Sequence, residues 1–486
     1  MERSSGVLMH ISSLFGDYSV GSFGHTAAYF CDFLAECGFS YWQVLPFNVT
    51  DECNSPYKSF GAFSGNPYFI DLETLYRRGL LTDEELAESR QNTPYSCEFE
   101  RLADERMALL RRAASRADLR ERREIATFLN AHRGVADFCR FMALKEANDY
   151  GVWTDWKEER YSEQNLFVWQ FIQYEFYTQW MAIKAYANAK GIRVIGDIPI
   201  YVAHDSSDVW ANREVFQLDE NGAPTSVAGV PPDYFSADGQ LWGNPLYDWK
   251  KMKADGYRWW TDRMNYMLEL FDGVRIDHFR GLESYWSVPA GETTAKNGKW
   301  VKGPGLPFVK HLRQIAGDRL IIAEDLGDIS PEVVQLVEKS GFPGMRVLQF
   351  AFLGDRNSPH LPHNYDKNCV AYTGTHDNNT LLGFMWEQDD ATRRHITAYC
   401  GYESEDWDRS YGALIRAIMA SHADLVIFPI QDVLRYGADT RMNIPGKAEG
   451  NWRYRVTREQ LDQIDRRYYR ELNELYTREN RGKTAQ

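Results

Sequence analysis

The chain has 486 residues, 44% hydrophobic and 26% charged, a composition that is ordinary for a globular protein with a large core. Its 55 Lys and Arg against 69 Asp and Glu leave a formal net charge of -14, which repels nucleic-acid phosphates and anionic membrane surfaces. No apolar run approaches the ~18 residues of a membrane span, and the start of the chain has no signal-peptide pattern. We therefore expect a cytoplasmic protein with neither nucleic-acid nor membrane partners.

The cysteines give no sign of a metal site. The chain has 7 of them, scattered from Cys31 to Cys400, without a Cys-x-x-Cys pair and without a histidine at ligand spacing. The sequence therefore predicts reduced, mostly structural thiols and no metal.

Eight short apolar runs recur along the chain, separated mainly by segments with helical periodicity. Their continuous Val, Ile and Leu content, without clean alternation, is typical of parallel strands that are buried on both faces. Eight such strands predict the α/β class and a (β/α)8 (TIM) barrel. The runs are residues 41–47, 66–72, 192–200, 272–279, 319–327, 345–352, 369–378 and 425–432.

The longest gap lies between the second and third runs. Residues 73–190 contain a charged helical pattern and then a long aromatic helix that ends at Gly191, which predicts a helical insertion between barrel strands 2 and 3. Residues 205–270 form a second predicted insertion, after strand 3, and residues 458–480 a predicted C-terminal helix. We expect residues 1–486 to form a single catalytic barrel with mainly helical subdomains inserted on its loops.

Carboxylates follow several of the predicted strands. Functional groups of such barrels lie at the carboxyl ends of the strands, where this sequence has Asp197, Asp277, Glu324 with Asp325, and Asp377. A single aspartate there often caps the next helix or pairs with an arginine, which is the simpler interpretation of each residue alone. Four strands that end in this way favour a carboxylate site instead.

The segment "VRID" suggests how two of these carboxyls differ. Strand alternation places Arg275 and Asp277 on the same face, and an adjacent guanidinium keeps a carboxylate ionised, as a nucleophile must be. Glu324 ends an apolar run, where loss of solvent raises its pKa and keeps it protonated as a general acid. Such a pair is what retaining glycoside chemistry requires.

Four segments make the sequence recognisable. "GDIPIYVAHDSSDVW", "DGVRIDHFRGL", "IIAEDLG" and "GTHDN", in that order, resemble the signature regions of the α-amylase clan, and in detail those of the amylomaltases or 4-α-glucanotransferases. Further matches, including "SPYKSFGAFSGNPYFIDL" near the start and "NIPGKAEGNWRYR" near the end, extend the resemblance over nearly the whole chain.

The resemblance implies roles for individual residues. Asp277 matches the nucleophile, Glu324 the acid/base and Asp377 the transition-state stabiliser. Three further residues match positions that orient the nucleophile or hold the sugar at the cleavage point, and four lie in segments that line the glucan groove. The first three are Asp197, Arg275 and His376, and the other four are Tyr57, Trp242, Asn244 and Asn451.

The implied activity is the transfer of an α-1,4-glucan segment to the 4-hydroxyl of another glucan or of glucose, through a covalent glycosyl-enzyme and without a cofactor. Maltooligosaccharides and α-1,4-glucans are then both donors and acceptors. Residues 227–235, "VAGVPPDYF", are a candidate active-site lid that excludes water. A glucan hydrolase of the amylase or α-glucosidase type, using the same carboxylates, is the alternative. A carbohydrate-binding protein on a degenerate barrel predicts loss of at least one of the three carboxylates.

Overall fold

The computed structural model describes residues 2–50, 53–232, 237–354, 356–402 and 406–479. Eight parallel strands form one sheet in the spatial order β10-β11-β12-β1-β2-β3-β6-β9. The outer strands meet, because the Ala323 N–H in β9 donates to the carbonyl of Pro343, just before β10, at 2.9 Å. The predicted (β/α)8 barrel is therefore confirmed. Its strands are β1 (Ser4–Leu8), β2 (Tyr41–Gln43), β3 (Arg193–Ile198), β6 (Gly273–Ile276), β9 (Leu320–Ala323), β10 (Gly344–Val347), β11 (Cys369–Tyr372) and β12 (Leu425–Pro429).

One predicted strand is wrong and one real strand was missed. Residues 66–72 form no strand, because Asn66 caps a 3-10 turn, Pro67–Phe69, by accepting the Tyr68 N–H, and Pro67 has no N–H for a ladder. The first strand is instead β1, which begins with Ser4 and Ser5 and therefore does not form a continuous apolar run. Gly6 lets β1 lie close to β2, since a Cβ there would lie 2.5 Å from the Tyr41 carbonyl oxygen.

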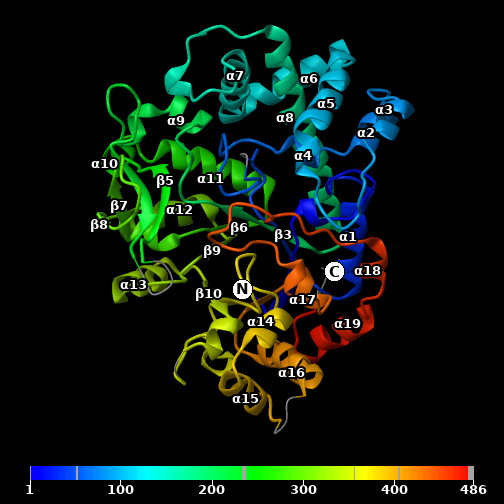
Figure 1. Ribbon diagram of the computed structural model, residues 1–486, viewed down its shortest axis with the longest axis vertical. Helices are drawn as coiled ribbons and strands as arrows, with labels where there is room; N and C mark the ends of the chain where they lie inside the picture. The colour runs from blue at the N-terminus through cyan, green and yellow to red at the C-terminus, as the bar shows by residue number, and fades with distance from the viewer. Residues whose placement is uncertain (1, 51–52, 233–236, 355, 403–405, 480–486) are drawn as a thin grey trace.

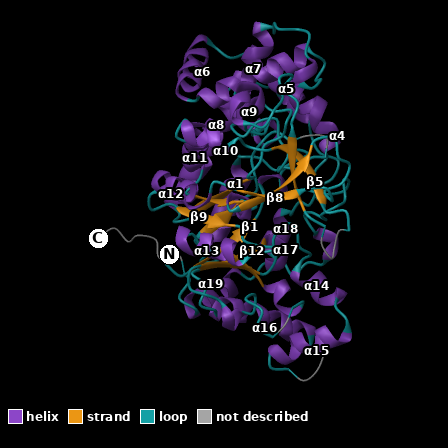
Figure 2. Ribbon diagram, turned by 90° about the vertical axis from the view of Figure 1, so that its left-hand side faces the viewer, coloured by secondary structure: helices purple, strands orange, loops and turns teal. Residues whose placement is uncertain are grey.

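Helices surround the barrel (Figures 1 and 2). Each helix contacts the next one around the barrel, in the order α16, α19, α1, α8, α11, α12 and α13. The predicted long helix is confirmed as α8, which ends just before Gly191, whose φ of 77° is a left-handed conformation suited to glycine. These helices are α1 (His25–Glu36), α8 (Glu163–Ala189), α11 (Arg258–Leu270), α12 (Gly305–Ala316), α13 (Pro331–Ser340), α16 (Trp407–Ala420) and α19 (Arg466–Leu475).

The segment between β2 and β3 is mainly helical. Figure 1 shows α5, α6 and α7 at the end of the molecule farthest from α15 and α16. α8 contacts α5, α6 and α7 as well as α1 and β3, so it joins this group to the barrel. The division of the chain into subdomains with bounds at 73–190 and 205–270 stays a prediction. The helices are α2 (Leu72–Arg77), α3 (Asp83–Glu88), α4 (Phe99–Arg101), α5 (Met107–Ser115), α6 (Leu119–Ala131) and α7 (Arg133–Ala147).

A second sheet, which the sequence did not reveal, lies beside the barrel. It is antiparallel, with the order β5-β4-β7-β8, and joins the segment after β3 to the segment after β6. The expected lid over residues 227–235 begins inside β4, and its Tyr234 and Phe235 lie outside the described residues. The strands are β4 (Ser226–Val230), β5 (Gln240–Pro245), β7 (Ser284–Pro289) and β8 (Lys299–Lys302).

Short helices complete the chain. The predicted single helix over 458–480 is wrong, because Asp465 starts a new helix by accepting the Tyr468 N–H at 3.0 Å, so that α18 and α19 are separate. In the described residues, no helix is both long and apolar enough to cross a bilayer. The remaining α-helices are α9 (Ser207–Ala211), α10 (Trp249–Ala254), α14 (Leu381–Glu387), α15 (Asp390–Tyr399), α17 (Ile430–Val433) and α18 (Arg458–Asp462).

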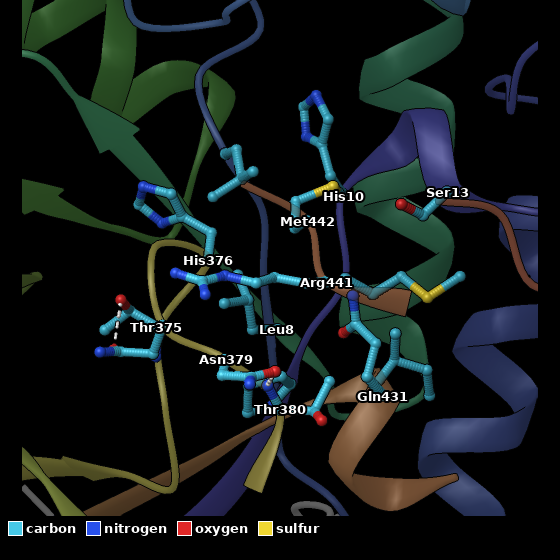
Figure 3. A pocket seen from close by; sticks show the side chains of 15 residues that line it. Leu8, His10, Ser13, Thr375, His376, Asn379, Thr380, Gln431, Arg441 and Met442 are labelled. Atoms are coloured by element: carbon cyan, nitrogen blue, oxygen red, sulfur yellow. Dashed lines mark hydrogen bonds between the residues drawn. The ribbon is translucent and has the colours of Figure 1, made fainter. Parts of the chain in front are cut away.

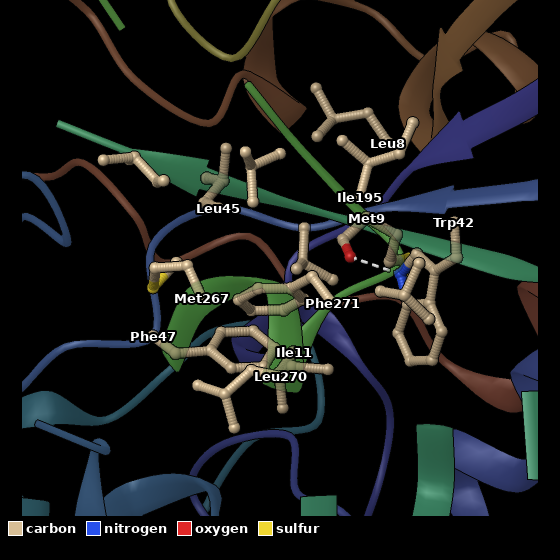
Figure 4. Close-up of a cluster of buried hydrophobic side chains, with 14 of the residues drawn as sticks. Leu8, Met9, Ile11, Trp42, Leu45, Phe47, Ile195, Met267, Leu270 and Phe271 are labelled. Atoms are coloured by element: carbon tan, nitrogen blue, oxygen red, sulfur yellow. Dashed lines mark hydrogen bonds between the residues drawn. The ribbon is translucent and has the colours of Figure 1, made fainter. Parts of the chain in front are cut away.

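An apolar cluster fixes the strands that carry the site (Figure 4). The Trp42 Nε1–H donates to the Met9 carbonyl at 2.7 Å, which ties β2 to the end of β1. The Phe271 ring lies against β3, where a Cβ on Gly196 would come within 2.3 Å of it. Glycine at this position lets α11 and β3 pack closely, and the next residue along the strand is Asp197.

Candidate active site

The candidate site lies at the carboxyl ends of neighbouring barrel strands. Asp197 in β3 is the register partner of Arg275 in β6, and Ile276 is the partner of Ala323 in β9. Asp277 and Glu324 therefore follow two adjacent strands at the same level of the barrel, where functional groups of this fold lie.

Arg275 links two of the carboxylates. Its Nη1 donates to both oxygens of Asp197 at 2.9 and 2.8 Å, and its Nη2 donates to Oδ1 of Asp277 at 2.7 Å. Burial alone lowers the pKa of Arg275, but Asp197 and Asp277 raise it well above the usual value. Asp197 is fully buried, whereas the side chain of Asp277 is 31% exposed. The predicted pairing of Arg275 with Asp277 on one strand face is confirmed, and the exposed carboxylate is the one open to a ligand.

Glu324 is held differently. Its Oε2 accepts the His278 N–H at 2.7 Å and its Oε1 accepts the Leu326 N–H at 2.8 Å. Burial raises the pKa of Glu324 to about 7, against the opposing effect of Arg275 and with a contribution from Asp277. The expected direction of this shift is confirmed. Glu324 thus changes protonation near neutral pH.

His278 adopts a strained backbone conformation that serves Glu324. Its φ of 50° lies in the left-handed region, which is uncommon for residues other than glycine, and it turns the N–H toward the Glu324 carboxyl. The Phe279 N–H, one residue later, donates to the Glu324 carbonyl at 3.1 Å. The segment after β6 therefore supplies Asp277 and positions Glu324 as well.

Asp377 lies on the loop after β11 and is 48% exposed. Its Oδ1 accepts Asn443 Nδ2 at 2.7 Å and lies 3.3 Å from His376 Nε2. Burial would raise the pKa of Asp377, but His376 and Asn443 hold it below its usual value. Burial lowers the pKa of His376, yet Asp377 outweighs this effect and the net shift is upward. The two shifts agree on an imidazolium–carboxylate pair.

Tyr57 joins the two halves of the site. Its hydroxyl donates to Oδ2 of Asp197 at 2.6 Å and lies 3.4 Å from Nδ1 of His376. The Tyr57 and His376 rings stack at a centroid distance of 4.9 Å, and Trp452 lies near both. A continuous chain of contacts thus runs from Asp277 through Arg275, Asp197, Tyr57 and His376 to Asp377.

Three of the predicted groove residues form no hydrogen bond with the carboxylates of the site in the described chain. The Trp242 ring, on β5, meets the His278 ring edge to face at 4.8 Å, so it borders the site. Asn244 donates to the Val202 carbonyl at 3.0 Å. Asn451 uses both ends of its amide on the backbone of Ile444 and Lys447. Their roles in glucan binding stay predictions.

Asp325, next to Glu324, points elsewhere. Its Oδ1 accepts the Met345 N–H at 2.6 Å and its Oδ2 lies 3.5 Å from Arg346, so it ties β9 to β10. For Asp325 the simpler interpretation therefore holds: this strand-end carboxylate pairs with an arginine and has a structural role.

Two residues of the site escaped sequence reasoning. Asn443 bonds the Asp377 side chain, and Arg441 Nη2 donates to the Asp377 carbonyl at 2.6 Å. Figure 3 shows Arg441 and His376 among the side chains that line a small cavity, to which other residues of the loop after β11 also contribute. The segment "NIPGKAEGNWRYR" begins with Asn443, so it was the signal that could have found this residue.

Within the described ranges, no group of three or more His, Cys, Asp or Glu side chains is arranged to hold a metal ion. The fold and the three carboxyls instead define a (β/α)8-barrel enzyme with a carboxylate site.

Comparison with known proteins shows to which family of (β/α)8-barrel enzymes the chain belongs. The profile of one family, described as 4-alpha-glucanotransferase, matches residues 9–461. A 4-alpha-glucanotransferase of Clostridium butyricum is 43% identical over 92% of this chain and 95% of its own. The chloroplastic/amyloplastic 4-alpha-glucanotransferase of Solanum tuberosum is 41% identical over 93% and 82%, respectively. The chain belongs to this 4-alpha-glucanotransferase family.

Solved structures agree. An amylomaltase from Streptococcus agalactiae, in complex with acarbose, superposes with a TM-score of 0.94 at 36% identity, covering 98% of this chain and all of that one. The amylomaltase of Corynebacterium glutamicum shares the fold, with a TM-score of 0.82 at 18% identity, over 97% of this chain and 75% of its own.

Proposed function

We propose that the protein is a 4-α-glucanotransferase that acts by a retaining double displacement, with α-1,4-glucans and maltooligosaccharides as donors and with glucans or glucose as acceptors. The observation that supports this most is the contrast between Asp277, anchored by Arg275, and Glu324, whose pKa burial raises to about 7. Two carboxyls in such different environments are suited to the roles of nucleophile and acid/base.

In the first step, Asp277 attacks the anomeric carbon of a bound glucose unit. Its Oδ1 is engaged by Arg275, whereas its Oδ2 has no hydrogen-bond partner among the described groups, so Oδ2 is the attacking oxygen. As the C1–Oδ2 bond forms and the glycosidic C1–O bond breaks, Glu324 gives its proton to the departing 4-oxygen.

In the second step, the 4-hydroxyl of an acceptor replaces the leaving glucan. Glu324, now ionised, takes the proton of this hydroxyl while the acceptor oxygen attacks C1. The C1–Oδ2 bond breaks and the Asp277 carboxylate is released. Two inversions restore the α configuration, and Glu324 regains its proton.

Asp377 stabilises the transition state in this account. Its charge is fixed by His376 and its position by Asn443, so its free oxygen can bind ring hydroxyls of the sugar. Contacts that tighten as the sugar acquires oxocarbenium character lower the barrier rather than only the KM. In the same proposal the candidate lid, residues 227–235, has the role of keeping water from the glycosyl-enzyme, and its residues 233–235 lie outside the described chain. The cysteines, none of which forms a disulfide in the described chain, suit a cytoplasmic enzyme.

The test is to incubate the protein with maltotriose alone and to resolve the products by length, with Asp277→Asn as the control. We expect glucose together with chains longer than maltotriose, and neither from the variant. Glucose and maltose with nothing longer would show that water is the acceptor and would favour the hydrolase.

A further inference from the structure

A groove outside the carboxylate site lies between the segment that follows β12 and the start of α19. Its volume is about 330 Å³, at the lower end of the ~300–1,000 Å³ range of small-molecule sites. Its walls combine tyrosines with amide side chains: Tyr436, Tyr468 and Tyr469, and Gln460 and Gln463. We call this the tyrosine groove.

The aromatic walls are held in place by the backbone around them. The Tyr469 hydroxyl donates to the Val433 carbonyl at 3.1 Å, and its ring meets the Tyr468 ring nearly at right angles, 5.2 Å away. The Tyr468 N–H donates to the capping Asp465, and the Tyr436 N–H donates to the Gln431 carbonyl at 2.9 Å. Tyr436 and Tyr468 are half-buried, so each ring keeps an accessible part in a fixed orientation.

The polar groups of the groove are largely unused. The hydroxyls of Tyr436 and Tyr468 and the side chain of Gln463 form no hydrogen bond with any described group. The Oε1 atom of Gln460 accepts the Thr457 N–H at 2.9 Å, and its Nε2 stays available to donate. These groups offer both donors and acceptors to a ligand.

Charge points to a neutral ligand. The cation among the lining residues, Arg435, is already paired with Asp408 at 2.7 Å, and the lining anion, Asp465, caps α19. The groove thus offers no free cation for a phosphate. Flat apolar rings with polar tips, bordered by amides, suit a polyhydroxylated ligand whose C–H faces pack on the rings.

The groove is also connected to the catalytic loop. Asn443, which bonds Asp377, is seven positions after Tyr436 in the chain, and seven residues span at most ~25 Å. A long glucan held in the groove therefore stays near the site, whereas a trisaccharide gains nothing from it.

We propose that the tyrosine groove is a second α-1,4-glucan-binding site that retains long substrates beside the catalytic site. This inference rests on the proposed function for the identity of its ligand. The groove raises the local concentration of long glucans by making their second contact intramolecular.

The experiment compares Tyr468→Ala with Tyr150→Ala, a tyrosine that is 55% exposed and follows α7, which lies at the other end of the molecule from α19 (Figure 1). Retardation is measured by native electrophoresis in gels that contain amylose, and kinetics are measured on amylose and on maltotriose. For Tyr468→Ala we expect at least fivefold weaker retardation and about a fivefold higher KM for amylose, with maltotriose turnover unchanged. Tyr150→Ala should behave as the wild type.

Gln463→Ala guards against misfolding, because Gln463 is exposed and its loss removes polar contacts alone. It should weaken retardation about twofold to threefold. Equal behaviour of the groove variants and Tyr150→Ala on amylose would overturn the proposal. So would a change in oligomeric state with unchanged retardation, which would assign the groove to contact with a second copy of the chain.

The two proposals fail in different ways. If the wild type forms no product longer than maltotriose, the transferase assignment fails, while retardation that depends on Tyr468 would still establish the groove as a glucan site.

Discussion

Asp197 and Arg275 face each other across strands β3 and β6, and a single guanidinium nitrogen, Nη1, donates to both oxygens of the buried Asp197 carboxylate. The other nitrogen, Nη2, is thereby aimed at Asp277. The nucleophile of the proposed mechanism is thus oriented by a carboxylate that it does not touch, through an arginine that both share.

We predict that Arg275→Lys lowers kcat on maltotriose about 100-fold or more. A lysine has one point-like charge and cannot hold Asp197 and Asp277 in the fork geometry of a guanidinium. Arg275→Ala should in addition lower the free energy of unfolding by about 3–5 kcal/mol, because it leaves Asp197 buried without a partner. Product analysis and urea denaturation check the two parts. Nearly normal turnover of the lysine variant would contradict the first.

The donor half-reaction should lose rate as the pH rises through about 7, because Glu324, whose raised pKa is about 7, is the acid only while protonated. On maltotriose, kcat/KM should fall toward tenfold per pH unit above this value. With an α-maltosyl fluoride donor, whose leaving group needs no proton, Glu324→Gln should form the glycosyl-enzyme without this decline. If the variant still lost rate above pH 7 in the same way, the decline would belong to the titration of another group.

The same shift predicts a pH-dependent difference in stability. The folded pKa of Glu324, about 7, lies above its ordinary value of 4.5, so the folded state binds the proton more tightly than the unfolded state. Stability is therefore lost as the pH rises from about 4.5 to 7. Between pH 4.5 and 8, the free energy of unfolding of Glu324→Gln should rise by about 1–3 kcal/mol relative to that of the wild type. A shift of one pKa unit corresponds to roughly 1.4 kcal/mol, and screening by solvent reduces this value.

Urea denaturation at both pH values measures this gain. The amide also loses one backbone acceptor contact, but that cost does not vary with pH and cancels in the comparison. A stability difference that is flat over this interval would refute the raised pKa.

Asn443 should act on the reaction through Asp377. Its hydrogen bond to a half-exposed carboxylate is worth roughly 1.5 kcal/mol, so Asn443→Ala should lower kcat about tenfold. Asn443→Asp should lower kcat further, since it places a second negative charge beside Asp377. Steady-state kinetics of the two variants, with thermal unfolding as the control for folding, give the comparison. If the aspartate variant were the more active of the two, this role would be wrong.

Much of the barrel was predictable because its strands are buried on both faces and hence appear as continuous apolar runs. β1 escaped this signal, since Ser4, Ser5 and Gly6 begin it and close packing against Tyr41 selects a glycine rather than an apolar side chain. The run around Phe69 is equally apolar, but Asn66 and Pro67 turn it into a 3-10 helix. The short antiparallel sheet carries no clear period, so only the tertiary structure reveals it.

The heart of the site was predictable for a different reason. Asp277 and Glu324 follow strands directly, and strand alternation alone pairs Arg275 with Asp277. Asn443 lies on an irregular loop, 66 positions from its partner Asp377, and no local period links the two. Asn451 lies on the same loop, where its amide bonds the backbone of Ile444 and Lys447, and its role in glucan binding stays a prediction.

The central claim is that Asp277 forms a covalent bond to the sugar, and trapping that bond tests it most directly. Glu324→Gln, incubated with α-maltosyl fluoride, should accumulate the glycosyl-enzyme, because no general base then activates the acceptor. Peptide mass spectrometry should place one maltosyl group on the peptide that contains Asp277, and the double variant with Asp277→Asn should carry none. An adduct on another peptide, or turnover of the fluoride by the double variant, would contradict the account.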